Sequence, residues 1–264
     1  MKTALTIAGF DPTGGAGVQM DIKVFNHFGV YGLSVVSALT AQNTFEIRNI
    51  IASDKKCLEE QLFTIISDIR PDALKTGMLF SKDAVSVVAK AVKGFDLQNL
   101  VVDPVTVSTT GTALLKEGVL DFIMNELFPL AKVITPNIYE ASVLSGIAIE
   151  DVEDMRRASE ELKKTGAENI IITGGHFEKY NERNKLDRAE TLDLMYDGVK
   201  FHSISGRKIK GEYHGTGCAF SAAITALLAR EASVEEALKR TREFISFAVE
   251  NAYNLGKGMR LLNI

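Results

Sequence analysis

TALTIAGFDPTGGAGVQMDIKVFNHF, residues 3–28, is the stretch of the chain that decides the fold. It begins with a short apolar run of β-forming residues that ends at Gly9. A turn-rich segment with three more glycines follows at residues 11–17, and apolar residues then recur at helical spacing from Val18 to Phe28. This order of strand, glycine loop and helix is typical of a ligand-binding βα unit.

The glycine loop of this unit does not fit two common phosphate-binding motifs. Gly9 and Gly14 have the separation found in a P-loop, but Gly15 stands where that motif requires lysine. Nor do the glycines match the Gly-x-Gly-x-x-Gly pattern of a dinucleotide-binding unit, which disfavours a nicotinamide-dependent oxidoreductase. We therefore expect the loop to pack around a small ligand.

The same alternation of strand, turn and helix occurs at least five times along the chain. It predicts an α/β fold with a mostly parallel sheet and helices on both faces. Ligands bind such sheets beyond the carboxyl ends of the strands, which is where the polar and glycine-containing clusters of this chain fall. The pair Asp197-Gly198 then predicts a β-hairpin, and two helices are expected at residues 217–230 and 234–255.

The composition narrows the class of protein. The 264 residues include 30 basic and 34 acidic side chains without a polybasic run, which argues against a nucleic-acid or membrane-surface protein. The apolar run before Asp11 is too short for a signal peptide or a membrane span, so we expect a cytoplasmic location. Cys57 and Cys218 lack the spacing of a zinc site or a disulfide framework. A single domain over residues 1–264 is the simplest organisation, since no linker-like segment is present.

A second glycine-rich stretch, GEYHGTGCAF at residues 211–220, opens directly onto the first of those two helices. The first amides of a helix have no partner within it and carry partial positive charge, so a helix start can bind an anion. Gly215 and Gly217 leave no side chain between these amides and a ligand. Cys218 falls in the first turn, where we expect the pKa of a thiol to be lowered. The stretch predicts a phosphate-handling site, and the alternative is a loop that caps an ordinary buried helix.

Six segments of the chain together resemble the hydroxymethylpyrimidine/phosphomethylpyrimidine kinases of thiamine biosynthesis, within the ribokinase-like superfamily. They occur in the order found in that family, and the resemblance extends from residue 3 to about residue 253. It implies a three-layer αβα sandwich around a central, mostly parallel sheet. The segments are TIAG-x-DP-x-GGAG-x-Q-x-D (6–21), AQNT (41–44), K-x-GML (75–79), VDPV (102–105), TPN-x-x-E (135–140) and HGTGC (214–218).

The resemblance implies transfer of the γ-phosphoryl group of ATP to 4-amino-5-hydroxymethyl-2-methylpyrimidine, and then a second transfer to the resulting monophosphate. Such a transfer needs alignment of the hydroxyl, neutralisation of the spreading charge and uptake of a proton. By similarity, the amides of Gly215, Thr216 and Gly217 form the anion hole. Cys218 stands where the wider superfamily commonly has an aspartate base, so we expect it to accept or orient the hydroxyl proton.

The same resemblance assigns four residues to the substrate pocket. Gln42 is expected to read the ring, because its amide offers a donor and an acceptor to an aminopyrimidine edge. The alternative for Gln42 is an amide that satisfies a loop. Asp21 is expected to hold the substrate hydroxyl or amino group, or else to be a solvated helix carboxylate. Gly9 and Met78 are expected to line the pocket, although methionine is also a common core residue.

Further residues are expected around the nucleotide and a magnesium ion. Asn137 and Glu140, at a helix start, support the metal and phosphate shell in the superfamily, and hard oxygen ligands suit Mg2+. Asp103 is expected near both the triphosphate and the metal, and Thr173 near ATP. Relatives are commonly dimers, so the resemblance also implies a homodimer.

Two departures from the family pattern concern the nucleotide. Many relatives carry lysine where this chain has Thr173, and many carry another lysine within the segment that here reads VSTTG, residues 107–111. The loss of either cation would weaken ATP binding. Arg207, Lys208 or Lys210, near the second glycine-rich stretch, is the expected substitute charge.

Two alternative functions fit many of the same residues. A pyridoxal or pyridoxine kinase acts on a ring that also carries a hydroxymethyl group. A catalytically weak, vitamin-binding regulatory protein would keep the pocket and tolerate the missing lysines. Asn137, Glu140 and the Gly-Thr-Gly-Cys loop favour an active enzyme, and His214 beside that loop is expected to be structural.

Overall fold

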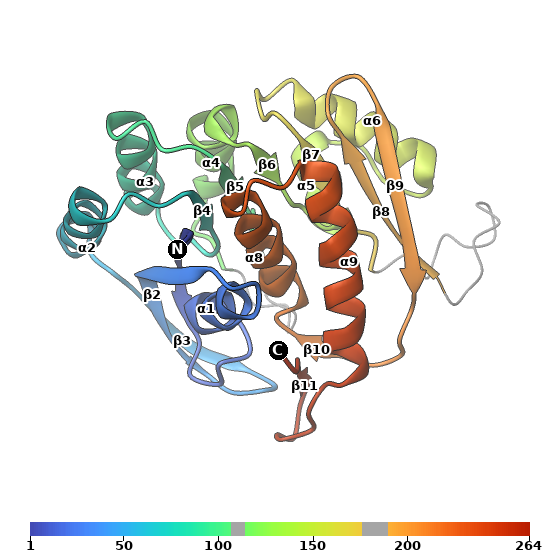
Figure 1. Cartoon of the computed structure of the whole chain (residues 1–264), viewed down its shortest axis with the longest axis horizontal. Coiled ribbons are helices and arrows are strands. Elements are labelled where there is room, and N and C mark those ends of the chain that lie inside the picture. The colour runs from blue at the N-terminus through green and yellow to red at the C-terminus, as the bar shows by residue number, and fades with distance from the viewer. Residues whose placement is uncertain (107–113, 176–189) are drawn as a thin grey trace.

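The computed structural model describes residues 1–106, 114–175 and 190–264, and its main feature is a nine-stranded sheet with helices on both faces (Figure 1). The inner strands pair in parallel, whereas β3 at one edge and β8 and β9 at the other are antiparallel to their neighbours. The expected α/β fold with a mostly parallel sheet is confirmed. In spatial order the strands are β3 (Ile47–Ala52), β2 (Tyr31–Gln42), β1 (Thr3–Phe10), β4 (Ala73–Thr76), β5 (Leu100–Val102), β6 (Val133–Ile134), β7 (Ile170–Ile172), β8 (Glu190–Tyr196) and β9 (Phe201–Arg207).

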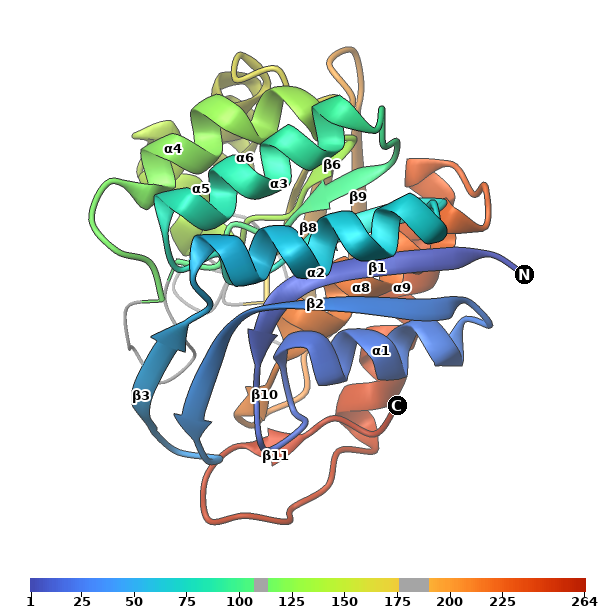
Figure 2. The same ribbon diagram turned by 90° about the vertical axis from the view of Figure 1, so that its left-hand side faces the viewer.

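Helices cover the sheet in two layers, which Figures 1 and 2 show from two sides, so the expected three-layer αβα arrangement is confirmed. One face carries α1 (Gly17–His27), α8 (Thr216–Ala229) and α9 (Val234–Glu250). The other face carries α2 (Lys55–Asp68), α3 (Lys82–Gly94), α4 (Val119–Glu126), the short 3-10 helix η1 (Phe128–Leu130), α5 (Ile138–Ser145) and α6 (Val152–Lys163). A separate two-stranded sheet joins β10 (Tyr213–His214) to β11 (Arg260–Leu261).

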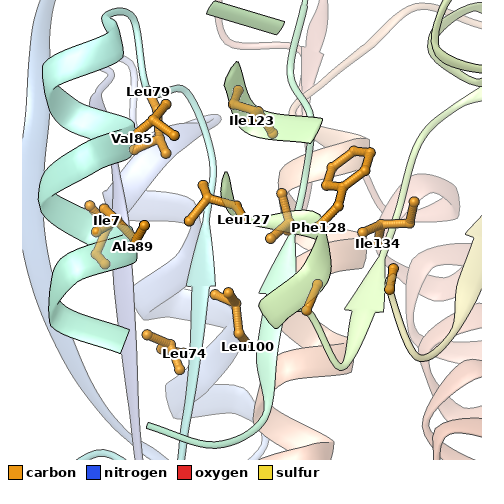
Figure 3. Packing of buried hydrophobic residues seen from close by; sticks show 14 of the residues in the cluster. Ile7, Leu74, Leu79, Val85, Ala89, Leu100, Ile123, Leu127, Phe128 and Ile134 are labelled. Atoms are coloured by element: carbon orange, nitrogen blue, oxygen red, sulfur yellow. The ribbon is translucent and has the colours of Figure 1, made fainter. Parts of the chain in front are cut away.

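The two cores follow from the alternation of side chains along the strands. On β1, Leu5 and Ile7 join the core under α2 to α6, whereas Ala4 joins the core under α1, α8 and α9. Figure 3 shows part of the first core, in which the fully buried Phe128 lies beside Ile134. Strands buried on both faces need continuous apolar runs, and this is the pattern that the sequence carries.

Local sequence fixes the starts of the helices. Ser81 accepts a hydrogen bond from the amide of Ala84 at the start of α3. Asn137 and Glu140 form a reciprocal capping box at the start of α5. Helix α8 differs, because its N-cap is Gly215 and no side chain caps it. The first amides of α8 are therefore left for another partner.

Some sequence predictions differ from the structure in their boundaries. The hairpin of β8 and β9 turns at Asp197-Gly198 as predicted, but the last helix ends at Glu250 rather than at residue 255. Strand β3 was not predicted, because it is largely exposed and its sequence does not alternate between apolar and polar residues. The segment 107–111, where relatives carry a lysine, lies outside the described residues. Within the described parts, no helix is both long and apolar enough to cross a membrane.

Candidate active site

The polar strand ends that the sequence predicted come together at one edge of the sheet. Strands β2, β1, β4, β5 and β6 are consecutive parallel neighbours, so their carboxyl ends share this edge. The start of α8 packs onto the same edge, where the amide of Gly17 donates a hydrogen bond to the sulfur of Cys218. At or just beyond these strand ends lie Asp11, Gln42, Met78, Asp103 and Asn137.

The two glycine-rich stretches lie against each other. Gly215 has a φ of 78°, a left-handed conformation that favours glycine, and a Cβ there would lie 1.8 Å from the carbonyl oxygen of Gly15. Gly17 has a φ of 60°, and its Cβ would lie 2.1 Å from the carbonyl oxygen of Gly9. A side chain at Gly215 would force the two stretches apart, and one at Gly17 would push the start of α1 away from the end of β1. Glycine is therefore required where the first loop meets the start of α8.

The first turn of α8 presents free amides at this edge. A Cβ at Gly217 would meet no atom within 4 Å, so this position, unlike Gly215, faces open space. No side chain caps the amides of this turn, and Gly217 itself is exposed. The aligned dipoles of the 14-residue helix add to the attraction. This geometry supports the predicted anion hole.

A fully enclosed ion pair lies beside the loops. Lys75 of β4 donates from Nζ to Oδ1 of Asp21 on α1 at 2.8 Å, and neither side chain has any exposed surface. Thr6 of β1 donates to the other carboxylate oxygen at 2.5 Å. The interpretation of Asp21 as a solvated helix carboxylate is therefore wrong, because its oxygens are engaged inside the protein. Direct contact of Asp21 with the substrate stays a prediction.

Lys75 is the cation of an otherwise acidic cluster. Burial opposes its charge, but Asp21, Cys218 and Asp103 outweigh burial and raise the pKa of Lys75. Burial raises the pKa of Cys218 to about 12; Lys75 opposes this rise, and Asp21 and Asp103 add to it. The expectation of a lowered pKa for Cys218 is wrong, because burial and two neighbouring carboxylates outweigh the helix dipole. Cys218 is a neutral thiol in this site.

Asp103 and Glu140 form the acidic side of the site. Ser221 of α8 donates to Oδ2 of Asp103 at 2.8 Å, and Asp103 is buried. Glu140 closes the capping box with Asn137 and also accepts from the amide of Thr106 at 3.2 Å. Burial, together with the nearby Asp103, raises the pKa of Glu140 to about 8. The two carboxylates therefore repel each other, and a cation beside them would relieve the repulsion.

A histidine ties Gln42 to the second glycine-rich stretch. The side-chain nitrogen of Gln42, at the end of β2, lies 3.0 Å from Nε2 of His214. The same Nε2 lies 2.7 Å from Oδ2 of Asp11, and Asp11 and His214 are both buried. Burial alone would raise the pKa of Asp11, but hydrogen bonds from His214 and Thr13 outweigh it and lower that pKa. Asp11 and His214 thus connect Gln42, which is predicted to recognise the substrate ring, to the start of α8.

Gly9, Met78 and Thr173 complete the predicted set. A Cβ at Gly9 would lie 2.5 Å from Cε of Met78, so the methionine covers the glycine directly. Met78 also packs against Ala38 and is 8% exposed, which makes it largely a core residue in this conformation. Thr173 forms an isolated β-bridge with Asn137 at the neighbouring strand end. The predicted residues therefore lie along one edge of the sheet.

The family model described as phosphomethylpyrimidine kinase matches residues 11–263. The chain belongs to the phosphomethylpyrimidine kinase family. A hydroxymethylpyrimidine/phosphomethylpyrimidine kinase of Bacillus subtilis is 38% identical over 256 residues, which cover 97% of this chain and 92% of that protein. A pyridoxine kinase of the same organism is 38% identical over 261 residues, covering 97% and 93%. The crystal structure of an ADP complex of Bacillus subtilis pyridoxal kinase matches at 36% identity with a TM-score of 0.87, covering 100% of this chain and 97% of that one.

Membership of the phosphomethylpyrimidine kinase family makes the chain a phosphotransferase with a ribokinase-like fold, so the predicted family, fold and enzyme class are confirmed. The ADP in the related kinase structure supports ATP as the phosphoryl donor. A nicotinamide-dependent oxidoreductase does not fit this family.

Lys75 and Ser221 are residues of the site to which the sequence predictions gave no role. A signal for Lys75 was available, because it interrupts the apolar strand Ala-Leu-Lys-Thr, and all four residues of that strand are buried. A lysine is almost never fully buried without a partner, so its place in a central strand implies a buried acid nearby. Ser221 has no such signal, since serine is unremarkable among the small residues of α8.

Proposed function

We propose that the chain transfers the γ-phosphoryl group of ATP to the hydroxymethyl group of 4-amino-5-hydroxymethyl-2-methylpyrimidine, and then phosphorylates the resulting monophosphate. The observation that carries this proposal is the position of Gln42, which His214 holds beside the uncapped start of α8. A side-chain amide can match the amino group and ring nitrogen of an aminopyrimidine, and free amides can stabilise a phosphoryl group. One end of the site would read the ring while the other stabilises the transferred charge.

The reaction depends on positioning and charge stabilisation more than on covalent catalysis. The amides of Thr216 and Gly217 would hold oxygens of the moving phosphoryl group. Lys75 would supply a fixed positive charge that offsets the negative charge of the transition state. Cys218, as a neutral thiol, would orient the acceptor hydroxyl by a hydrogen bond and would not take up its proton. The hydroxyl proton would pass to an oxygen of the transferred phosphoryl group as the new O–P bond forms and the bond to ADP breaks.

Mg2+ fits the acidic side of the site. Asp103 and Glu140 offer carboxylate oxygens, which this ion prefers, and their mutual repulsion favours a cation beside them. The described residues contain no group of three or more His, Cys, Asp or Glu that would hold a metal ion alone. The two carboxylates would therefore bind the ion together with phosphate oxygens of ATP, as is usual for Mg2+. When bound, the ion supplies positive charge to the β- and γ-phosphates.

A coupled assay of ADP formation tests this function. The purified chain is given the pyrimidine, its monophosphate or pyridoxal, and kcat/KM is measured for each. We expect both pyrimidines to be preferred over pyridoxal. A clear preference for pyridoxal would refute the assignment, and tight pyrimidine binding without ADP formation would favour a regulatory protein instead.

Phosphorylation of pyridoxal or pyridoxine is the second candidate function. It is favoured by the similarity to a pyridoxine kinase, which is as high as the similarity to the pyrimidine kinase, at 38% identity each. Gln42→Ala separates the two, because a ring without the amino group has less to lose from removal of this amide. We expect this variant to lower kcat/KM for the pyrimidine by about tenfold, the value of a good hydrogen bond.

We also propose that residues 1–264 form one domain. Two copies of this domain would associate as a homodimer through β2 and β3. Leu39 and Ile51 are cross-strand partners and are 51% and 60% exposed, and Phe45 between the two strands is 51% exposed. Adjacent exposed apolar side chains of this kind are typical of an interface. Light scattering should give about twice the chain mass of 28.8 kDa, and Leu39→Glu should give the single mass. A monomeric wild type would contradict the proposal.

A further inference from the structure

The hydrogen bonds around Gln42 contain a conflict. Nε2 of His214 lies 2.7 Å from Oδ2 of Asp11 and 3.0 Å from the side-chain nitrogen of Gln42. An ionised carboxylate only accepts hydrogen bonds, so Nε2 of His214 must carry a proton and donate it to Asp11. The amide nitrogen of Gln42 is also a donor. Two donors would therefore face each other across 3.0 Å.

A second conflict lies at the other end of the same amide. Oγ1 of Thr40 is 3.0 Å from the carbonyl oxygen of Phe10 and 3.2 Å from Oε1 of Gln42. Both of these atoms are acceptors, but a hydroxyl has a single proton to donate. The oxygen and nitrogen of a side-chain amide are told apart by their hydrogen bonds rather than by shape.

Half a turn of the Gln42 amide replaces the donor–donor contact with a shared hydrogen bond, and it leaves Thr40 with a single acceptor. The amide oxygen then accepts the proton of Nε2 that His214 shares with Asp11. The amide nitrogen donates to Thr40, whose own proton remains available for the carbonyl oxygen of Phe10. Since one change removes the contact between two donors and leaves Thr40 with a single acceptor, this orientation is the one that the hydrogen bonds around Gln42 select.

The fold holds this orientation in place. Asp11 is 3% exposed, and its Oδ1 accepts from the amide of Thr13 at 2.9 Å. The backbone amide of Asp11 donates to Oε1 of Gln19 at 3.0 Å. A Cβ at Gly15 would lie 2.5 Å from Cδ2 of His214, so the imidazole ring packs directly against the first glycine loop. Neither Asp11 nor His214 is free to move away from the other.

We propose that His214 is a specificity-determining positioning residue for the function proposed above. It fixes the oxygen of Gln42 towards itself and the nitrogen towards Thr40. Among the described residues no other group bonds to this amide, so Gln42 has one N–H and one lone pair left for a ligand, in a set order. That pair complements a heterocycle with an amino group next to a ring nitrogen, and it mismatches a ring that lacks the amino group. The order of donor and acceptor is thus set by a residue 172 positions away along the chain.

His214→Gln and His214→Asn are a matched pair of variants that test this role. In histidine and glutamine the ε nitrogen lies two bonds beyond Cγ, so glutamine can present an N–H near the position of Nε2. Asparagine is one bond too short. The readout is the ratio of kcat/KM for the 4-amino pyrimidine to kcat/KM for the same ring without the amino group.

We expect the wild-type ratio to be about ten or more, the effect of one well-placed hydrogen bond. His214→Asn should bring the ratio to about one, mainly through KM for the amino compound, whereas His214→Gln should keep most of it. Gln42→Ala should abolish the ratio, and His214→Asn should add nothing in that background, because both changes act through the same amide. His202→Asn, at a partly exposed histidine of β9, is the control and should leave the ratio unchanged.

An unchanged ratio in folded His214→Asn, or an equal loss in both His214 variants, would overturn the proposal. Thermal unfolding shows which variants are folded. If His214→Asn is not, Thr40→Val tests the same orientation from the other end of the amide, and there too an unchanged ratio refutes it. A wild type that phosphorylates neither pyrimidine refutes the proposed function itself, whereas an active wild type with insensitive variants refutes only the role of His214.

Discussion

Two ion pairs of this chain each join a basic side chain to a buried aspartate, but their surroundings differ. Lys75 and Asp21 meet at 2.8 Å beside the two glycine-rich stretches, and neither side chain is exposed. Arg242 of α9 and Asp193 of β8 meet at 3.3 Å near the far edge of the sheet, and 13% of the Arg242 side chain is exposed. Lys75 also faces a second carboxylate, that of Asp103.

The two ion pairs differ in role: Lys75 places a positive charge at the site, whereas Arg242 holds a helix against the sheet. Arg242 also donates to Thr191 of β8, and Asp193 accepts from the amide of Gly174, so this group links α9 to the sheet. Lys75 has three donor protons, and among the described residues only Asp21 accepts from it. We infer that the remaining charge of Lys75 acts on the site, whereas that of Arg242 acts only on its own partners.

Lys75→Met should have the largest effect of any change at either pair. It leaves Asp21 buried without its partner, which lowers the free energy of unfolding by about 3–5 kcal/mol. It also removes the positive charge near the proposed phosphoryl site, so we expect kcat to fall by at least about a hundredfold. Chemical denaturation and the ADP assay measure the two effects. A folded variant with near-normal kcat would reduce Lys75 to a structural residue.

Arg242→Met is the matched control for that variant. It should lower the free energy of unfolding by about 2 kcal/mol, because Asp193 loses its ionic partner, while kcat/KM changes by no more than a few-fold. Adding Asp21→Leu to Lys75→Met should recover most of the stability without recovering activity, since a buried apolar pair replaces a buried ion pair well. If Arg242→Met lost as much turnover as Lys75→Met, Lys75 would not differ from Arg242 in its effect on the site.

The reactivity of Cys218 sharpens the comparison, because Lys75 is its nearby cation. With a pKa of about 12, the thiolate fraction at neutral pH is small and rises about tenfold per pH unit up to that value. Alkylation by iodoacetamide at neutral pH should be on the order of a thousandfold slower than for a free thiol. The measurement uses a Cys57→Ser background, because Cys57 is exposed. A plateau of the alkylation rate below about pH 8 would contradict the raised pKa of Cys218. It would instead support the lowered pKa that the sequence predicted.

At acid pH, Glu140→Gln should have the smallest effect of these variants, and its effect appears in the pH dependence of stability. An acid whose pKa rises from 4.5 to about 8 on folding binds its proton more tightly in the native state. This tighter proton binding adds to the free energy of unfolding. The contribution is fully present below pH 4.5 and is lost as the pH rises to about 8, by up to about 1.4 kcal/mol per pH unit. In the variant, the free energy of unfolding should decline less steeply between pH 4.5 and about 8. Denaturation curves at several pH values measure it, and an unchanged slope would show that Glu140 does not titrate there.

Much of the site could be predicted from the sequence, because polar residues at the ends of buried strands must share an edge in a parallel sheet. Gln42, Asp103 and Asn137 were found in this way, and the resemblance then supplied their roles. The start of α8 was found from the glycine-rich stretch and the run of small and apolar residues that follows it. Lys75 received no role, although a lysine inside a buried strand already implies an acidic partner.

The properties that depend on distant neighbours could not be predicted. The pKa of Cys218 was expected to fall because the sequence shows a helix start but not the carboxylates that α1 and β5 bring beside it. Asp21 was expected to be solvated or to bind substrate, and its enclosure by Thr6 and Lys75 depends on the pairing of β1 with β4. The contact between Gln42 and His214 joins two loops from opposite ends of the sequence.

The contact between Gly15 and Gly215 also bears on how the enzyme folds. Two backbones that touch with no room for a side chain can reach this geometry only after the segments on both sides are ordered. The contact joins residues at opposite ends of the sheet-forming sequence, and closing so long a loop is entropically unfavourable until the intervening strands have paired. We infer that the start of α8 reaches its place against Gly15 late in folding, after the intervening strands have paired. During synthesis the two glycine-rich stretches cannot meet before residue 215 has been made, so the proposed phosphoryl site cannot form on a shorter nascent chain.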